Sequence, residues 1–141
     1  MANAPRSDRI HAALMLTVAG ATIAYWVEHF TKGRLQTEDD DPAYLAFENA
    51  FPAADAYMAA CFIASALLLR KQNAAAVPLG IAAGSAMVFL GAMDTLYNLQ
   101  HGKYRKMDSA MAAETIINVV SFTFGPATMV RLWRARRRLA G

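Results

Sequence analysis

Residues 74–99 have the sequence AAAVPLGIAAGSAMVFLGAMDTLYNL, in which Asp94 is the only charged side chain. An α-helix rises about 1.5 Å per residue, so about 20 residues cross the hydrocarbon core of a bilayer, which is about 30 Å thick. This run is long enough to do so. The sequence therefore predicts a transmembrane helix with one acidic group inside the membrane.

Three more apolar runs accompany it, at about 10–30, 52–69 and 111–133. The second and third runs are joined by the short segment 70–73, which favours a helical hairpin. Of all 141 residues, 56% are hydrophobic and 18% are charged, whereas a soluble domain has about 45–50% and about 25%. We predict a single domain over 1–141, an all-α integral membrane protein with a bundle of four transmembrane helices.

The first run resembles a signal peptide only at its start, where basic residues precede it. It ends in bulky aromatic residues, including Tyr25 and Trp26, where a cleavage site requires small ones. We therefore interpret it as a transmembrane helix that ends in an interfacial aromatic belt.

Basic residues are distributed unevenly around the four runs. Nine lie on the side that carries both termini and the 70–73 segment, where Asp8 is the only acidic residue: Arg6, Arg9, Arg70, Lys71, Arg131, Arg134, Arg136, Arg137 and Arg138. The other side has five basic and ten acidic residues. Lys and Arg are enriched in cytoplasmic segments, so we predict cytoplasmic N- and C-termini in a plasma (inner) membrane. Residues 134–141 would form a basic cytoplasmic tail against anionic lipid, and nucleic acid is not an expected partner.

The longest connection, residues 31–51, is predicted to be an extracytoplasmic loop. Its acidic segment, residues 38–42, lacks the alternating ligands and the Gly of a calcium loop, which favours a solvated charge run. The apolar residues of 43–51 are spaced for one face of a helix, which indicates a short interfacial helix.

The third run carries an ordered face. Its members step by four and three residues, which keeps them on one side of a helix: Gly80, Gly84, Met87, Gly91, Asp94, Asn98 and His101. A similar face in the fourth run contains Glu114, Asn118, Ser121, Gly125 and Thr128. One half of each face is polar and the other half is mostly small, which permits close packing in lipid. Because the two runs are antiparallel, we expect Asp94 and Asn118 to lie at a similar depth.

The first and third runs also resemble each other. Each ends in the pattern Tyr-x-aliphatic-Glu/Gln-His, at 25–29 and 97–101, and each is followed by a loop and a Glu that leads the next helix. The pattern is compatible with a tandem repeat of two helical hairpins, although so short a match also arises by chance.

Polar residues near the outer ends of the four helices define a candidate site. Its predicted ligand-binding residues are Glu28, Glu48, Asp55, Asp94, Asn98, Glu114 and Asn118. None of the four runs has Lys or Arg well inside it, so a buried Asp94 must be protonated, hydrogen-bonded by Asn98 and Asn118, or bound to a cation. A structural clasp between helices is therefore an alternative to a binding site.

The same region offers ligands for a divalent metal ion: His29, His101, Asp94 and Glu114. Helix bundles bind zinc, manganese or iron with carboxylate and imidazole groups. The specificity is weak, because the sequence has no His-x-x-x-His, Glu-x-x-His or His-Glu-x-x-His motif. Haem is disfavoured because both histidines lie at the rim of the bundle.

We predict that the protein binds a cation or a small or lipid ligand in this acidic, outward-facing site. Two alternatives stay open. In a lipid-phase isomerase or hydrolase, Asp94 and Glu114 would act as a general acid and base, and the pocket would open sideways into lipid, whereas a binding site is expected to open only to water. A proton- or cation-coupled carrier would require a dimer, because the polar faces stop halfway across the membrane.

Membrane lipid is an expected partner, and two surfaces of small residues are candidates for a homodimer. One consists of Gly80, Gly84 and Gly91, if that face points outward, and the other consists of Ala56, Ala60 and Ala64.

Overall fold

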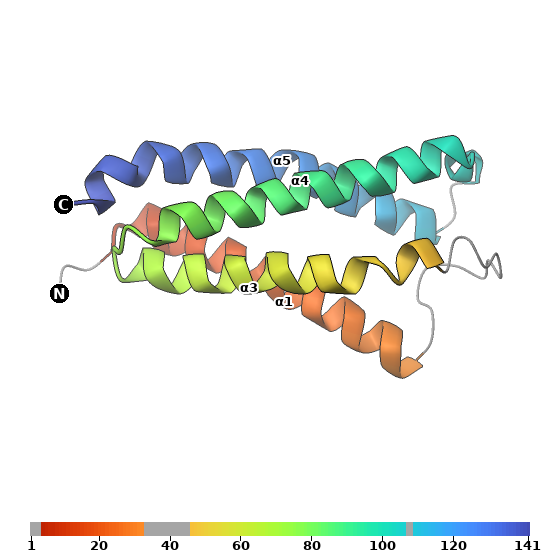
Figure 1. The fold of residues 1–141 in the computed structure, drawn as a ribbon, viewed down its shortest axis with the longest axis horizontal. Helices are drawn as coiled ribbons and strands as arrows, with labels where there is room; N and C mark the ends of the chain where they lie inside the picture. Colours follow the sequence, from red (N-terminus) through yellow and green to blue (C-terminus); the bar gives the residue numbers. More distant parts are fainter. Residues whose placement is uncertain (1–3, 33–45, 107–108) are drawn as a thin grey trace.

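The computed structural model describes residues 4–32, 46–106 and 109–141, most of which are helical (Figure 1). The helices are α1 (Arg6–Lys32), α3 (Phe51–Arg70), α4 (Ala76–Gln100), the short 3-10 helix η1 (Lys103–Arg105) and α5 (Ser109–Leu139). Four of them are long and apolar enough to cross a membrane. The predicted all-helical bundle with four candidate transmembrane helices is confirmed.

One prediction falls wholly, and another partly, outside the described residues. The acidic segment 38–42 lies there entirely. Of the predicted interfacial helix, residues 46–48 are helical, and residues 49–50 form a turn that leads into α3. At the C-terminus, α5 continues to Leu139, so most of the predicted basic tail belongs to the last helix.

Apolar side chains point outward as well as inward. Within the most apolar window of each long helix, only 28–39% of the residues are buried in the bundle. Phe30, Phe89, Leu99 and Ile116 are each more than 60% exposed. Water would solvate so much apolar surface poorly, whereas lipid chains solvate it well. Together with the helix lengths, this surface indicates an integral membrane protein.

Each long helix packs on the next one along the chain: α1 on α3, α3 on α4, and α4 on α5. The first and last helices, α1 and α5, have no comparable contact. Both termini and the α3–α4 turn lie at one end of the bundle, which we call the terminal end (Figure 1). Toward the opposite end, the loop end, α1 diverges from the other helices (Figure 1). Which side of a membrane each end faces stays a prediction.

Glycines let α4 and α5 approach each other closely. A Cβ atom on Gly84 would lie 2.7 Å from the carbonyl oxygen of Gly125, and one on Gly125 would lie 2.8 Å from that of Gly84. A Cβ on Gly91 would lie 2.7 Å from the Cβ of Ser121. Interiors are close-packed, so even a methyl group at Gly84 or Gly125 would push the two backbones apart.

This packing bears on the two dimer surfaces. Gly80, Gly84 and Gly91 are buried inside the chain, and each of them faces α5. The dimer that required this face to point outward therefore finds it already covered by α5. Ala56 and Ala60 of the second surface are exposed on α3, so a dimer there stays a prediction.

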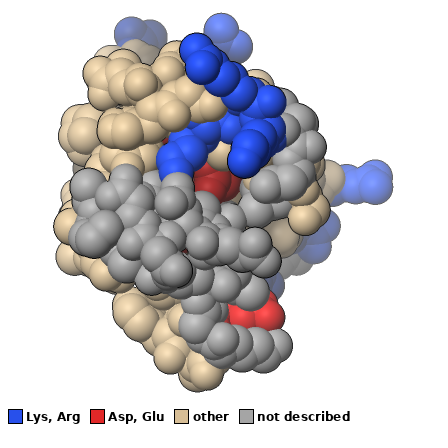
Figure 2. Space-filling model, turned by 90° about the vertical axis from the view of Figure 1, so that its right-hand side faces the viewer, with Lys and Arg blue, Asp and Glu red and all other residues tan. Residues whose placement is uncertain are grey.

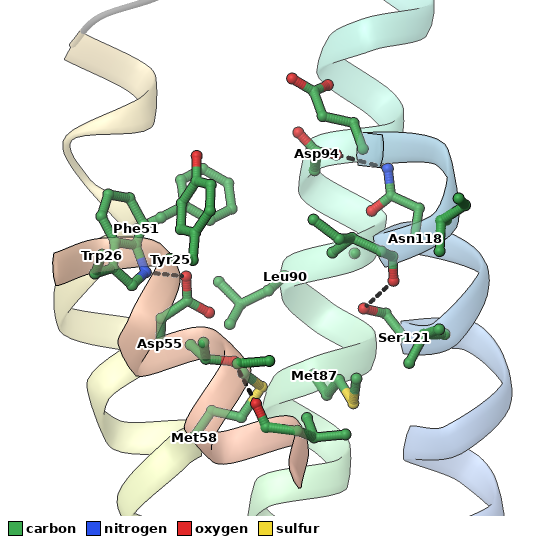
Figure 3. A pocket seen from close by; sticks show the side chains of 18 of the residues that line it. Tyr25, Trp26, Phe51, Asp55, Met58, Met87, Leu90, Asp94, Asn118 and Ser121 are labelled. Carbon is green, nitrogen blue, oxygen red and sulfur yellow. Dashed lines mark hydrogen bonds between the residues drawn. The ribbon is translucent and has the colours of Figure 1, made fainter. Parts of the chain in front are cut away.

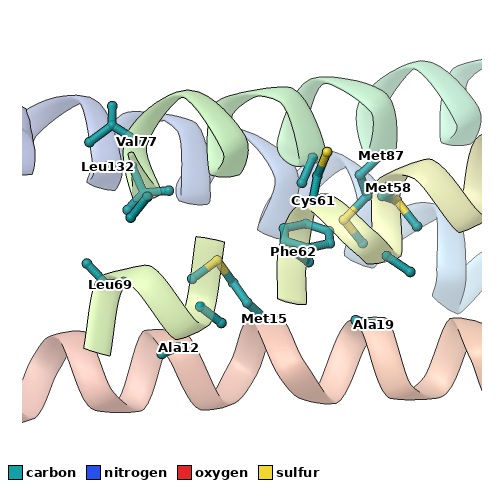
Figure 4. Packing of buried hydrophobic residues seen from close by; sticks show 14 of the residues in the cluster. Ala12, Met15, Ala19, Met58, Cys61, Phe62, Leu69, Val77, Met87 and Leu132 are labelled. Carbon is teal, nitrogen blue, oxygen red and sulfur yellow. The ribbon is translucent and has the colours of Figure 1, made fainter. Parts of the chain in front are cut away.

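The apolar core runs along the bundle axis (Figure 4). Its fully buried members include Ala12, Met15, Ala19, Phe62, Leu69, Ala83 and Leu132. The α1 positions 12, 15 and 19 are those that align with 84, 87 and 91 of α4 in the suggested repeat, and both sets are buried. This agreement supports the repeat, which nevertheless stays a prediction.

At the terminal end, a buried carboxylate holds α1 and α5 together. Asp8 is 3% exposed. It accepts hydrogen bonds from Gln72 at 3.0 Å, from Arg131 at 3.2 Å and from Arg138 at 2.8 Å. One turn later, the ring of His11 packs on Phe124 of α5 with centroids 5.5 Å apart. We call Asp8, Gln72, Arg131 and Arg138 the ionic cluster.

The α3–α4 turn supplies Gln72 to this cluster. Gln72 has a φ of +53°, in the left-handed region that glycine usually occupies after a helix. Its backbone N–H donates to Leu69, and that of Asn73 donates to Leu68, so the turn satisfies the last carbonyls of α3. Through the Gln72 side chain, which bonds Asp8 and Arg138, the turn is also tied to both termini.

Candidate functional site

Where α1 and α5 diverge, the bundle contains a pocket of about 340 Å³ that draws on all four long helices (Figure 3). Its polar lining residues are Thr22, Tyr25, Trp26, Glu48, Asp55, Asp94, Glu114, Asn118 and Ser121. Its apolar lining residues are Val18, Ala21, Phe47, Phe51, Met58, Met87, Leu90, Gly91, Ile116, Ile117 and Val120. None of the described residues that line it is Lys, Arg or His.

The α4–α5 wall brings together the amides and carboxylates of the two ordered faces. The side-chain N–H of Asn118 donates to Asp94 at 2.6 Å. The Asn98 side chain, 1% exposed, donates to Glu114 at 2.9 Å and to Asp94 at 3.4 Å. The prediction that Asp94 and Asn118 lie at a similar depth is confirmed. The Asn118–Asp94 and Asn98–Glu114 bonds join α4 to α5 as the predicted clasp would, but Asp94, Glu114 and Asn118 also line the pocket.

The α1–α3 wall has its own carboxylates. The indole N–H of Trp26 donates to Asp55 at 2.8 Å, and the hydroxyl of Tyr25 donates to Glu48 at 3.2 Å. Figure 3 shows Trp26 and Asp55 on one side of the pocket, and Asp94 and Asn118 on the other. The pocket therefore has acidic groups on both walls.

Glu48 is the most unusual of these groups. It is 8% exposed, and its Oε2 atom has no hydrogen-bond partner among the described residues. Its Oε1 atom lies 3.9 Å from Nδ1 of His29, which is a contact too long for a hydrogen bond. A buried carboxylate oxygen without a donor is costly, so this atom is a candidate for contact with a ligand or water.

The pocket reaches the outside of the bundle between α1 and α5. Ala21 of α1 and Ile117 of α5 line it and are also exposed on the surface, Ile117 at 49%. The other exposed lining residues of α5, Ile116 and Val120, are apolar as well. An apolar rim on a face that would be in contact with lipid makes this a lateral opening.

The loop end itself presents a different surface. Figure 2 shows it face on: Lys and Arg side chains gather toward the top of the view, one acidic area is recessed beneath them, and a second acidic area lies at the lower right. Lys103, Arg105 and Lys106 lie at this end, in and after η1. Basic side chains of the described residues therefore lie at the same end of the bundle as the pocket.

The predicted metal site is not supported. His101 is exposed, and its ring stacks on Tyr97 with centroids 4.0 Å apart. His29 lies on α1, not at the end of α4 as His101 does, and is buried near Glu48. Within residues 4–32, 46–106 and 109–141, no three His, Cys, Asp or Glu side chains are grouped so that they could hold a metal ion. Helical spacing placed both histidines at similar height, but it could not show that their rings point to different surroundings.

The structure places the predicted ligand-binding residues in three groups. Glu48, Asp55, Asp94, Glu114 and Asn118 line the pocket. Asn98 lies behind the wall and fixes Glu114. Glu28 is half-buried on α1 and is not among the described lining residues.

The sequence interpretation missed the aromatic part of the site. The sequence predicts Trp26 in an interfacial belt, but its indole N–H donates to Asp55 and its ring lines the pocket. Tyr25, Phe47 and Phe51 line it as well. The useful signal was spacing, because positions 18, 22 and 25 of α1 lie on one helical face, which a count of aromatic residues near an interface ignores.

The fold and site together define the class of protein: a helical membrane bundle with a lateral, acidic and aromatic pocket. Comparison with known proteins finds no matching family model, no similar curated protein and no similar solved structure.

Proposed function

We propose that the protein binds a small amphiphilic molecule that enters from the lipid phase between α1 and α5. The observation that carries this proposal is the combination of an apolar lateral opening with a pocket whose inner walls carry carboxylates and amides. Ligand pockets are mostly apolar, with a few polar groups that fix orientation. A molecule with an apolar body and a small polar head matches both parts.

The depth of the pocket argues against a transport path through one chain. Along α3 and α4, its lining ends at Met58 and Met87. Toward the terminal end, Met15 and Phe62 are fully buried and fill the space between the helices (Figure 4). A ligand could thus bind in this pocket without a continuous polar route across the bundle.

A lipid-phase enzyme is the second candidate, because a lateral opening is what such an enzyme requires. Asp94 and Glu114 would be its acid and base, and both line the pocket. Each accepts a hydrogen bond from an Asn side chain. Binding needs only this arrangement, whereas catalysis also requires proton transfer at the ligand.

The experiment is photolabelling in lipid nanodiscs. Two probes with the same diazirine-bearing alkyl chain would be used, one ending in a hydroxyl group and one in a trimethylammonium group. We expect at least one probe to label peptides of both α1 and α5 that line the pocket. Mass analysis of the recovered probe would show whether it has been chemically changed, which would favour the enzyme.

A matched pair of variants tests the entrance. Ala21→Phe adds a ring at the lateral opening, whereas Ala24→Phe adds the same ring at an exposed position of α1 that is not among the pocket residues. We expect Ala21→Phe to reduce labelling at least fivefold and Ala24→Phe to leave it within twofold. Labelling by neither probe, or equal labelling of both variants, would contradict the proposed function.

A further inference from the structure

The described lining of the pocket is acidic and includes no Lys, Arg or His, although Nδ1 of the neighbouring His29 lies 3.9 Å from Oε1 of Glu48. Four carboxylates line the pocket: Glu48, Asp55, Asp94 and Glu114. Asp55 and Asp94 accept hydrogen bonds only from neutral groups, Trp26 and two Asn side chains, and form no ion pair with described residues. Glu48 and Asp94 lie on different walls, so their carboxylates border the same space. A cation placed between the walls would interact favourably with both of them.

Glu48 shows where a ligand would be held. Its buried Oε2 atom has no partner in the described structure, and the residue lines the pocket. The Tyr25 hydroxyl fixes the other carboxylate oxygen, so the position of the free oxygen is set before a ligand arrives. Preorganised acceptors of this kind favour a positively charged group over a neutral one.

Aromatic rings line the α1–α3 wall of the pocket, which also carries Glu48 and Asp55. Tyr25 and Trp26 pack edge to face with centroids 5.1 Å apart, and Phe47 packs on Phe51 at 4.9 Å. All four rings line the pocket. Aromatic faces attract organic cations, and alkylated ammonium groups in particular bind among such rings. A small hydrated metal ion gains less from these surroundings, because it requires several oxygen ligands at short range.

We propose that the ligand carries an organic ammonium group, held by Glu48 and Asp94 among these rings, with its apolar body directed to the opening between α1 and α5. This inference rests on the proposed function and adds the charge and chemical class of the ligand head. An anionic head would face only further negative charge, and a neutral head would leave the carboxylates unbalanced.

Competition against the photoprobes tests the charge. Dodecyltrimethylammonium would be compared with its uncharged isostere, in which carbon replaces the nitrogen, and each would be titrated against whichever probe labels the pocket. We expect the ammonium compound to block labelling at a concentration at least tenfold lower than the isostere. Equal potency of the two compounds would overturn this inference, while the labelling itself would still support the proposed function.

Variants connect the preference to the carboxylates. In Glu48→Gln, and separately in Asp94→Asn, we expect labelling by the hydroxyl probe to persist and the preference for ammonium to fall to threefold or less. Glu28→Gln is the matched control, because it removes one carboxylate from α1 outside the described pocket lining, and the preference should be unchanged. A full preference in both pocket variants would overturn the assignment, and the second variant keeps the test valid if the first does not fold.

Discussion

The two ends of the bundle differ in how their acidic groups are bonded and in how closely α1 approaches α5. At the terminal end, one carboxylate, Asp8, accepts hydrogen bonds from two arginines and a glutamine, and α1 is held to α5. Toward the loop end, four carboxylates line a pocket that contains no described Lys, Arg or His, and α1 diverges from α5 (Figure 1).

The role of an acidic residue in this fold depends on whether its hydrogen-bond donors are charged. An Asp with charged donors works as a cross-link, because its charge is compensated inside the structure. Asp55 and Asp94 accept hydrogen bonds only from neutral groups among the described residues, so a positively charged ligand would stabilise them further. An acidic residue therefore joins α1 to α5 at the terminal end, whereas the acidic residues toward the loop end line a pocket in which a ligand can bind.

The largest expected effect concerns the close contact between α4 and α5, which lies between the two ends. Gly84→Val would place side-chain atoms against the backbone of Gly125, where a Cβ alone would already lie 2.7 Å from the carbonyl oxygen. We expect a loss of about 3 kcal/mol in the free energy of unfolding, because overpacking here must separate two backbones. Reversible unfolding in mixed micelles with increasing SDS would measure it.

Gly20→Val is the control for this variant. It adds the same side chain to a helical glycine at which a Cβ would meet nothing within 4 Å. We expect its stability to lie within about 0.5 kcal/mol of the parent or to increase. Equal destabilisation by the two variants would show that the α4–α5 contact is not the cause.

The next effect concerns the ionic cluster. Asp8→Asn leaves two arginines without their carboxylate, and we expect a loss of about 1–2 kcal/mol. The value is smaller than for a fully buried pair because the side chains of Arg131 and Arg138 are 36% and 46% exposed. The same SDS titration measures it, with Arg70→Gln as an exposed control at the same end. Photolabelling of the pocket should persist, and a variant as stable as the parent would contradict the cross-link.

The smallest effect should have the opposite sign. Asp94→Asn keeps the shape and one acceptor for Asn118 but removes a charge that has no ion-pair partner among the described residues. We expect stability to be unchanged or higher by up to about 1 kcal/mol, because less charge is buried. A loss comparable to that of Asp8→Asn would show that Asp94 is mainly a structural clasp, and the contrast between the two ends would fail.

Some features of the site follow from sequence because they depend only on helical spacing. Asp94 and Asn118 could be paired by counting residues from two antiparallel helix ends, and their 2.6 Å hydrogen bond confirms the prediction. The direction of individual side chains could not be obtained in this way. Trp26 faces Asp55 inside the bundle, and His101 stacks on Tyr97 outside it, although both lie near helix ends where an interfacial position is common.

The four long apolar helices could be predicted from the amino-acid sequence, because hydrophobicity and length suffice to specify a membrane-spanning helix. The sequence also determined that the acidic groups share one end of two helices, since periodicity fixes the faces. Three features became visible only in the tertiary structure. Gly84 packs on Gly125, Asp8 accepts hydrogen bonds from two arginines near the C-terminus, and a pocket lies between α1 and α5. These contacts join residues far apart in the chain, and their geometry depends on how whole helices pack and tilt, which local spacing does not encode.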